Sequence, residues 1–362
     1  MNRTYFSVTL LALSVVTGCS GDPSAPDYAT QGFHGEVKLA TCDLNHEPAL
    51  VRCGGDAAPG IIAAVCGDLE ADNTVTVTGG DLAVSGQSHL AAPLHVTGGS
   101  FTGLLGIQAD NTEDVSGDLA TAGDWVVSSP AHVGGDAFIG GKLEATNSVA
   151  VDGVLHVANA DTQHVTAGTI KADGTAVMDA LKCQLAPAPN ATIQRVEAGD
   201  FVDLGHALTA HSVAAEVTLD CARYRFTSFG IDNDLVLHVS GHTVIVVDGD
   251  VRVAAPMTVK LDPDATLDFL IGGSLEVDNT LSFSGGSTWL AIGNDLKIAA
   301  PLTLVGFLYA PQSAVAASEV SADNILSVSG SLLVNSVHVA SPITVTAVLG
   351  PALPPCAADE RQ

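Results

Sequence analysis

The sequence predicts an all-β protein folded as a right-handed β-helix, a β-solenoid with two arrays of coils of about 18–23 residues each. Three observations lead to this fold class. Two short phrases recur in alternation along the chain, apolar and polar residues alternate after each phrase, and the composition is aliphatic. Hydrophobic residues make up 47% of the chain but aromatic residues only 4%. A core with so few rings has to be filled by aliphatic side chains, and stacked parallel coils bring such side chains together.

The two phrases mark a corner that each coil must turn. Proline fixes φ, and an Asp-Asn pair hydrogen-bonds locally and tolerates the left-handed region, so each phrase can bend the chain. After a corner the pattern is that of a half-buried strand, as at Met257 and Val259 inward with Thr258 outward. The proline phrase occurs as LAAPLHV at 90, VSSPAHV at 127, VAAPMTV at 253, IAAPLTL at 298 and VASPITV at 339, and the asparagine phrase as ADNTVTV at 71, ADNTEDV at 109, ATNSVAV at 145, VDNTLSF at 277 and ADNILSV at 322.

Residues 1–18 have the features of a secretory signal: Arg3, an apolar run and small residues before Cys19. The ending Val-Thr-Gly-Cys resembles the lipobox of bacterial lipoproteins, which implies cleavage before Cys19 and lipidation of its thiol. Ser20 follows in place of the aspartate that retains such proteins at the inner membrane, so the resemblance favours the outer membrane. Residues 19–36 are rich in Pro, Gly and Ser and are expected to form a flexible tether.

The net charge limits which classes of partner the protein can bind. Removal of residues 1–18 takes away one arginine and no acid, which leaves 12 basic residues against 40 acidic ones, a net charge of −28. We therefore expect no nucleic-acid partner and attachment to the membrane only through the lipid anchor. An envelope polysaccharide or a protein is the expected partner, and a monomer is the expected state.

The rest of the chain divides into a first array at 37–182, a linker or side element at 183–220, a second array at 221–350 and a tail at 351–362. An even number of cysteines remains after lipidation, which is typical of disulfides in an exported protein, although the sequence leaves the connectivity open. The disulfide candidates are Cys42, Cys53, Cys66, Cys183, Cys221 and Cys356.

The segment 221–346 resembles a β-helical domain of unknown function found in exported, lipidated and pilus-associated bacterial proteins. Its most specific mark is a Gly-x-aliphatic-Tyr-Ala-Pro phrase, here Gly306, Tyr309, Ala310 and Pro311. The first array is more loosely similar to the solenoids of bactofilins. The resemblance implies a fold and an exported location, and it carries no catalytic residues.

Several side chains are candidates for chemistry. The Gly-Asp turns at Asp81, Asp118 and Asp136 could offer carboxylates to calcium between coils, although Gly-Asp also suits a turn. His95 and His132 hold a repeat position that threonine fills elsewhere, so we interpret them as ordinary outward residues. Otherwise no cofactor is expected.

Two further features are Glu113 and the threonines at 74–78. Glu113 stands where Val75 stands in the aligned phrase, which would bury a carboxylate, and a local bulge that turns it outward is favoured over a functional acid. Thr74, Thr76 and Thr78 form a TVTVT strand that could present hydroxyl groups in register, but the row is not repeated above and below, so no hydroxyl array is expected.

The leading hypothesis for function is a non-enzymatic lipoprotein: an acidic β-helical scaffold for adhesion or envelope structure. The alternatives are a β-helical carbohydrate-active enzyme and a bactofilin-like unit that polymerises end to end. An acidic groove with aromatic side chains on one face would favour an enzyme. The sequence does not show whether Trp125 and Trp289 share a face.

Overall fold

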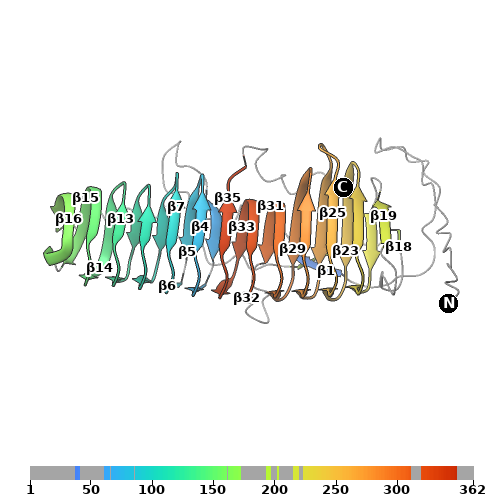
Figure 1. The fold of residues 1–362 in the computed structure, drawn as a ribbon, viewed down its shortest axis with the longest axis horizontal. Coiled ribbons are helices and arrows are strands. Elements are labelled where there is room, and N and C mark those ends of the chain that lie inside the picture. Colours follow the sequence, from blue (N-terminus) through green and yellow to red (C-terminus); the bar gives the residue numbers. More distant parts are fainter. Residues whose placement is uncertain are drawn as a thin grey trace, which may run out of the picture.

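The computed structural model describes residues 37–40, 61–65, 67–84, 86–160, 162–172, 193–196, 202–203, 215–219, 223–310 and 319–348. These residues form a long β-solenoid whose strands are almost all parallel to their neighbours in one 33-stranded sheet (Figure 1). A short 3-10 turn, η1 (Thr162–His164), interrupts the strands. The predicted fold class is confirmed. The signal, Cys19, the tether, the cysteines proposed to form disulfides, Pro311 and the tail lie outside the described residues.

Each coil contributes a strand to three faces, which we name A, B and C. In spatial order, face A consists of β19 (Ala215–Leu219), β22 (Leu235–Val239), β25 (Met257–Leu261), β28 (Leu281–Ser284), the first parts of β31 (Leu302–Ala310) and β33 (Leu326–Val334), β35 (Ile343–Thr346), β4 (Val75–Thr78), β7 (Leu94–Thr97), β10 (Glu113–Val115), β13 (Ala131–Val133), and the first parts of β15 (Val149–Ala160) and β16 (Val165–Lys171).

Face B follows the same order along the rod. It consists of β18 (Val202–Asp203), β20 (Arg223–Phe226), β23 (His242–Val247), β26 (Thr266–Ile271), β29 (Ser287–Ile292), the later parts of β31 and β33, β2 (Ile61–Val65), β5 (Asp81–Val84), β8 (Phe101–Gly103), β11 (Leu119–Thr121), the first part of β14 (Ala137–Ala145), and the later parts of β15 and β16.

Face C closes each coil between face B and the next strand of face A. It consists of β21 (Phe229–Ile231), β24 (Val251–Val253), β27 (Leu275–Val277), β30 (Leu296–Ile298), β32 (Glu319–Ala322), β34 (Ser336–Val339), β3 (Leu69–Ala71), β6 (Gln87–Leu90), β9 (Gly106–Ala109), β12 (Trp125–Val127) and the end of β14.

The two arrays form one continuous rod, but in the reverse of their order in the sequence. The last coil of the second array pairs with the first coil of the first array on every face: β33 with β2, β34 with β3, and β35 with β4. Figure 1 shows this directly, because the red C-terminal strands in the middle of the rod lie against the blue strands, while yellow and green mark its two ends. The hydrophobic core runs through the junction without a break.

This order has a consequence for the path of the chain. The first array ends at β16 and the second begins at β18, at opposite ends of the rod (Figure 1). Lys171 and Val202 therefore lie roughly 60 Å apart along the rod, at about 4.8 Å per coil. The number of residues between them spans about 100 Å when fully extended, so the connection is sterically possible.

The segment 183–220, read from the sequence as a linker or side element, contributes strands of its own. β18 and β19 pair with β20 and β22, so the solenoid begins before residue 221. β17 (Ile193–Val196) pairs antiparallel with β1 (Val37–Ala40), and these two strands form a separate two-stranded sheet.

Aliphatic side chains fill most of the core, as the composition predicts. Aromatic rings gather in one part of the second array, where Phe226, Phe229, Phe269 and Phe283 follow one another with ring centroids 5.3 to 6.4 Å apart. In the first array the largest buried side chains are Trp125 and Phe101.

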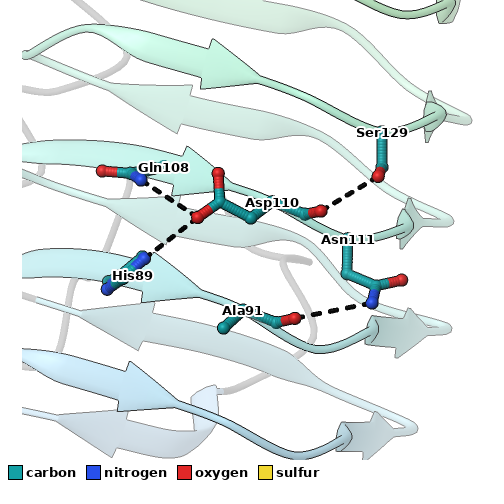
Figure 2. A network of polar contacts seen from close by, with 6 residues as sticks. All are labelled: His89, Ala91, Gln108, Asp110, Asn111 and Ser129. Carbon is teal, nitrogen blue, oxygen red and sulfur yellow. Dashed lines mark hydrogen bonds and ion pairs between the residues drawn. The ribbon is translucent and has the colours of Figure 1, made fainter.

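Both sequence phrases turn the same corner, the one between faces C and A, and they alternate from coil to coil. Asparagine acts as predicted: the Oδ1 of Asn111 accepts the N–H of Thr112 at 2.8 Å, and Asn73, Asn147, Asn279 and Asn324 make the equivalent bond. The Nδ2 of Asn111 also donates to the carbonyl of Ala91, in the proline corner of the preceding coil, at 3.4 Å (Figure 2).

Proline corners bond to asparagine corners in return. The carbonyl of Pro93 accepts the N–H of Val75 at 3.0 Å, and Pro301 likewise accepts from Leu281. The side-chain amide of an asparagine corner thus donates a hydrogen bond to a backbone carbonyl of a neighbouring proline corner. The carbonyl of a proline in turn accepts a backbone N–H from the coil that contains an asparagine corner. Because the two phrases alternate, backbone carbonyl and N–H groups find hydrogen-bond partners at a corner where the regular strand pairing stops.

Candidate functional site

The candidate site is a groove of ≈ 550 Å³ along the edge between faces A and B. It crosses successive coils of the second array and reaches the junction with the first, where Ile62 and Val348 line it. Concave surfaces of this size are the usual places where ligands bind, so this groove is the candidate binding site.

Glycines lie along the groove. Gly285, Gly306 and Gly330 lie at this edge in successive coils, with φ of 93°, 133° and 146°. A Cβ on Gly306 would come within 2.0 Å of the carbonyl oxygen of Thr288 in the coil below, so no larger residue fits there. Glycine at these positions lets adjacent coils stack closely along the groove, which gives Gly306 a structural role.

Two aromatic side chains stand side by side on the outward side of face B and line the groove. Trp289 of β29 and Phe307 of β31 are register partners in adjacent coils, and both are half-buried. They pack against a second, smaller hydrophobic cluster on the outside of face B, formed by Ala64, Ala291, Tyr309 and Leu333. Tyr309 of the family phrase thus points outward, whereas Ala310 is buried in the core.

The polar groups of the groove are acidic or neutral. Asp264 and Asp268 are its charged lining residues, and the Oδ2 of Asp268 lies 2.9 Å from the Nε2 of His242. The hydroxyl residues Thr266, Ser287, Thr288, Ser329 and Ser331 also line the groove. Among the described residues, the indole N–H of Trp289 is buried and has no hydrogen-bond partner. The groove therefore offers stacking surfaces and hydrogen-bonding groups of negative or neutral character.

Outside the groove, polar side chains pair with one another along the rod. On face C, His89 and Gln108 both contact the Oδ2 of Asp110 at 3.1 Å, and the Ser129 hydroxyl donates to the Asp110 carbonyl (Figure 2). The hydrogen bond with His89 lowers the pKa of the Asp110 carboxyl. Arg252 binds Asp278 in the same way at 2.8 Å. These outward side chains are used to join coils.

The Gly-Asp turns also join coils. The Oδ1 atoms of Asp81, Asp118 and Asp136 accept the N–H of Ser100, Asp136 and Val154 in the next coil at 2.7 to 2.8 Å. Burial raises the pKa of the Asp81 carboxyl, although the N–H of Ser100 opposes this shift. One oxygen of each carboxylate thus has a structural role, and calcium binding at these turns stays a prediction.

The expectation that the threonines of 74–78 belong to no array of hydroxyl groups is wrong for the outward row of face A. Thr76 is not isolated, because its register partner below is Thr344 of the other array, and the row of hydroxyl residues runs through Thr258, Ser282, Thr303, Ser327, Thr344 and Thr76. The row then continues as His95, Asp114 and His132. The error arose because the neighbouring coil lies far away in the sequence.

His132 and His95 occupy the outward position expected of them. The Nδ1 of His132 lies 3.0 Å from Asp114 and its Nε2 3.3 Å from Asp152. The hydrogen bond with Asp114 raises the pKa of His132. Within the described ranges, no group of three or more His, Cys, Asp or Glu side chains is arranged to hold a metal ion.

The expected bulge at Glu113 is wrong. Glu113 pairs in register with Leu94 and Ala131, and its side chain points into the core with no exposed area. The indole N–H of Trp125 donates to its Oε2 at 2.9 Å, whereas its Oε1 has no partner among the described residues. Burial raises the pKa of this carboxyl to about 7. Trp125 therefore points inward while Trp289 points outward, so the two tryptophans do not share a surface.

Residues 184–348 match a protein family described only as a domain of unknown function, DUF7305. The match spans the second array and, together with the β-solenoid, fits a β-helical domain of unknown function there. No curated protein and no solved structure matched the chain. No helix in the described part of the chain is long and apolar enough to cross a membrane.

The sequence reasoning missed the groove. Trp289 and Phe307 are 18 residues apart, close to one coil, and their spacing could have indicated that they are neighbours. Their position beside glycine corners depends on the turn geometry and was not evident from the spacing.

Proposed function

We propose that this protein is a non-enzymatic scaffold of the bacterial cell envelope, anchored by a lipid on Cys19 and serving adhesion or envelope structure. The observation that carries the proposal is the continuity of the rod. Two arrays far apart in the sequence stack through paired strands on all three faces, and their outward polar side chains largely bind one another. Such a rod is a stiff, acidic spacer that holds a surface away from its anchor.

Membrane fractionation with acyl labelling tests the anchor. Wild-type protein should incorporate labelled palmitate and sediment with outer membranes, and Cys19→Ala should lose the label and leave the membrane fraction. A Cys19→Ala protein that keeps its palmitate label would overturn the proposed lipid anchor at Cys19. Cys42→Ala is the matched control and should behave as wild type.

End-to-end polymerisation is a second candidate, and the junction between the arrays supports it. That junction demonstrates that coils of this type stack on coils from a distant part of the sequence. We expect monomers in analytical sedimentation. Filaments at micromolar concentration would favour the polymer-forming alternative. The acidic groove lined by Trp289 and Phe307 is the feature that favours the enzymatic alternative, and hydrolysis of a polysaccharide by the purified protein would decide for it.

A further inference from the structure

We infer that the groove between faces A and B binds an extended, uncharged polysaccharide chain that lies along the rod. The inference rests on the proposed function, because it names the partner of the scaffold. The groove follows the rod axis over several coils, so it suits a polymer lying lengthwise better than a compact small molecule.

The aromatic pair indicates a sugar. Trp289 and Phe307 are register partners, so their Cα atoms are about 4.8 Å apart along the rod, which is close to the length of one hexose unit. The apolar C–H faces of a pyranose ring pack on aromatic rings, and an aromatic side chain left half-exposed in a groove supplies such a surface. The indole N–H of Trp289 is buried, so Trp289 contributes its ring to the groove surface and not a hydrogen-bond donor.

The charges that line the groove indicate that the bound polysaccharide is neutral. Asp264 and Asp268 lie in the groove, and none of the residues that line it is a lysine, arginine or histidine. An acidic polysaccharide or a nucleic acid would meet these carboxylates in a chain whose net charge is −27, with His242 beside Asp268 as the adjacent group that can carry positive charge. Carboxylates and hydroxyl groups are acceptors for sugar hydroxyl groups, so the same lining fits a neutral glycan.

Glycine backbone forms the edge of the groove beside the rings. Gly285, Gly306 and Gly330 carry no side chain where faces A and B meet, because the backbone of the coil below leaves no space for one. A chain lying along this edge beside Phe307 therefore contacts glycine backbone in successive coils.

Fluorescence titration of the full chain in detergent tests the inference. The probes are four neutral hexasaccharides, namely β-1,4-glucan, β-1,3-glucan, α-1,4-glucan and chitin fragments, with oligogalacturonate as the acidic comparison. Trp125 is fully buried in the core, so a change in tryptophan emission on binding reports on Trp289. At least one neutral hexasaccharide should give a saturable change, and oligogalacturonate should give none.

Variants separate the groove from the rest of the surface. Phe307→Ala should weaken binding at least about tenfold, and Trp289→Ala should do the same when binding is followed by calorimetry. Phe138→Ala is the matched control, because Phe138 is an outward aromatic residue of face B that stacks on His156 at 4.8 Å, away from the groove. Its affinity should stay within about twofold of wild type, and thermal unfolding should verify that all three variants fold.

Several outcomes would overturn the inference. They are the absence of saturable binding to every neutral hexasaccharide, equal affinity in Phe307→Ala and wild type, and preference for oligogalacturonate. A wild-type dimer that Trp289→Ala converts to monomers would also overturn it, because the groove would then hold a second copy. These results leave the proposed anchor untouched, since that proposal fails only if Cys19→Ala keeps its lipid.

Discussion

The buried carboxyl of Glu113 should make the stability of the rod depend on pH. This side chain has no exposed area, and the indole N–H of Trp125 is its hydrogen-bond donor among the described residues. Burial raises its pKa from 4.5 to about 7 in the folded state. The folded protein therefore favours the protonated form of Glu113, while the unfolded chain releases the proton at a lower pH.

The sign and the size of the effect follow from this difference. Below about pH 4.5 the side chain is protonated in both states, and its burial costs least. Between pH 4.5 and about 7 the unfolded state binds fewer protons than the folded state, so the free energy of unfolding falls as the pH rises. Each pKa unit corresponds to about 1.36 kcal/mol, so the loss amounts to about 3 kcal/mol and is complete above about pH 8.

Glu113→Gln removes the charge and keeps an oxygen that can accept the indole N–H of Trp125. We expect this variant to be more stable than wild type at pH 8.5, by up to about 3 kcal/mol, and similar to wild type at pH 5. The assay is urea unfolding followed by circular dichroism at both pH values. Glu144→Gln is the control, because Glu144 is exposed and lies beside Lys142. If Glu113→Gln and wild type lose the same stability between pH 5 and 8.5, the carboxyl is not buried as described.

Three further predictions concern the stacking of the coils. The double variant Thr76→Cys, Thr344→Cys should form a disulfide, because these parallel register partners lie about 4.8 Å apart. Mass spectrometry of the digested protein detects the linked peptides. The control double variant Thr76→Cys, Thr258→Cys should form no such disulfide. Asn111→Ala loses its bonds to Thr112 and Ala91 and should lower the free energy of unfolding by about 1 kcal/mol, measured by urea titration. In chelator the chain should keep its β-rich circular dichroism spectrum, and its Tm should rise to a similar extent with calcium or with monovalent salt of equal ionic strength, since both screen the acidic surface. A chain that unfolds in chelator would instead indicate a calcium-dependent solenoid.

The fold class was predictable because its determinants are local. The proline and asparagine corners, the alternation of residues such as Met257 and Thr258, and the shortage of aromatic residues each indicate a coil that stacks on similar coils. The individual coil is encoded in about 20 consecutive residues, so a single sequence is sufficient to recognise it.

The candidate site was less predictable because it depends on which coils are neighbours. Nothing local to Glu113 reveals that Ala131 leaves room for its side chain in the next coil, or that Trp125 supplies a donor. The groove likewise requires glycine corners in successive coils beside Trp289 and Phe307. These are contacts between residues a coil or more apart, and the period of the repeat alone does not specify them.

The order of the two arrays can nevertheless be understood from the alternation of the corners. An asparagine corner donates its side-chain N–H to a proline corner, as Asn324 does to the carbonyl of Ala299 at 3.3 Å. The second array ends with the proline phrase at 339–342, and the first array begins with the asparagine phrase at 71–74. Stacked in the observed order they make the same bond, from Asn73 to the carbonyl of Ala340, at 3.3 Å.

The order of the sequence would break this rule. The last repeated phrase of the first array contains Asn147, and the first such phrase of the second array is Ile-Asp-Asn-Asp at 231–234. In the order of the sequence, the second array would follow the coil of β16, whose corner at 160–164 contains no proline and offers no proline-corner carbonyl. The observed order instead continues the alternation, because a proline corner at the end of the second array meets an asparagine corner at the start of the first.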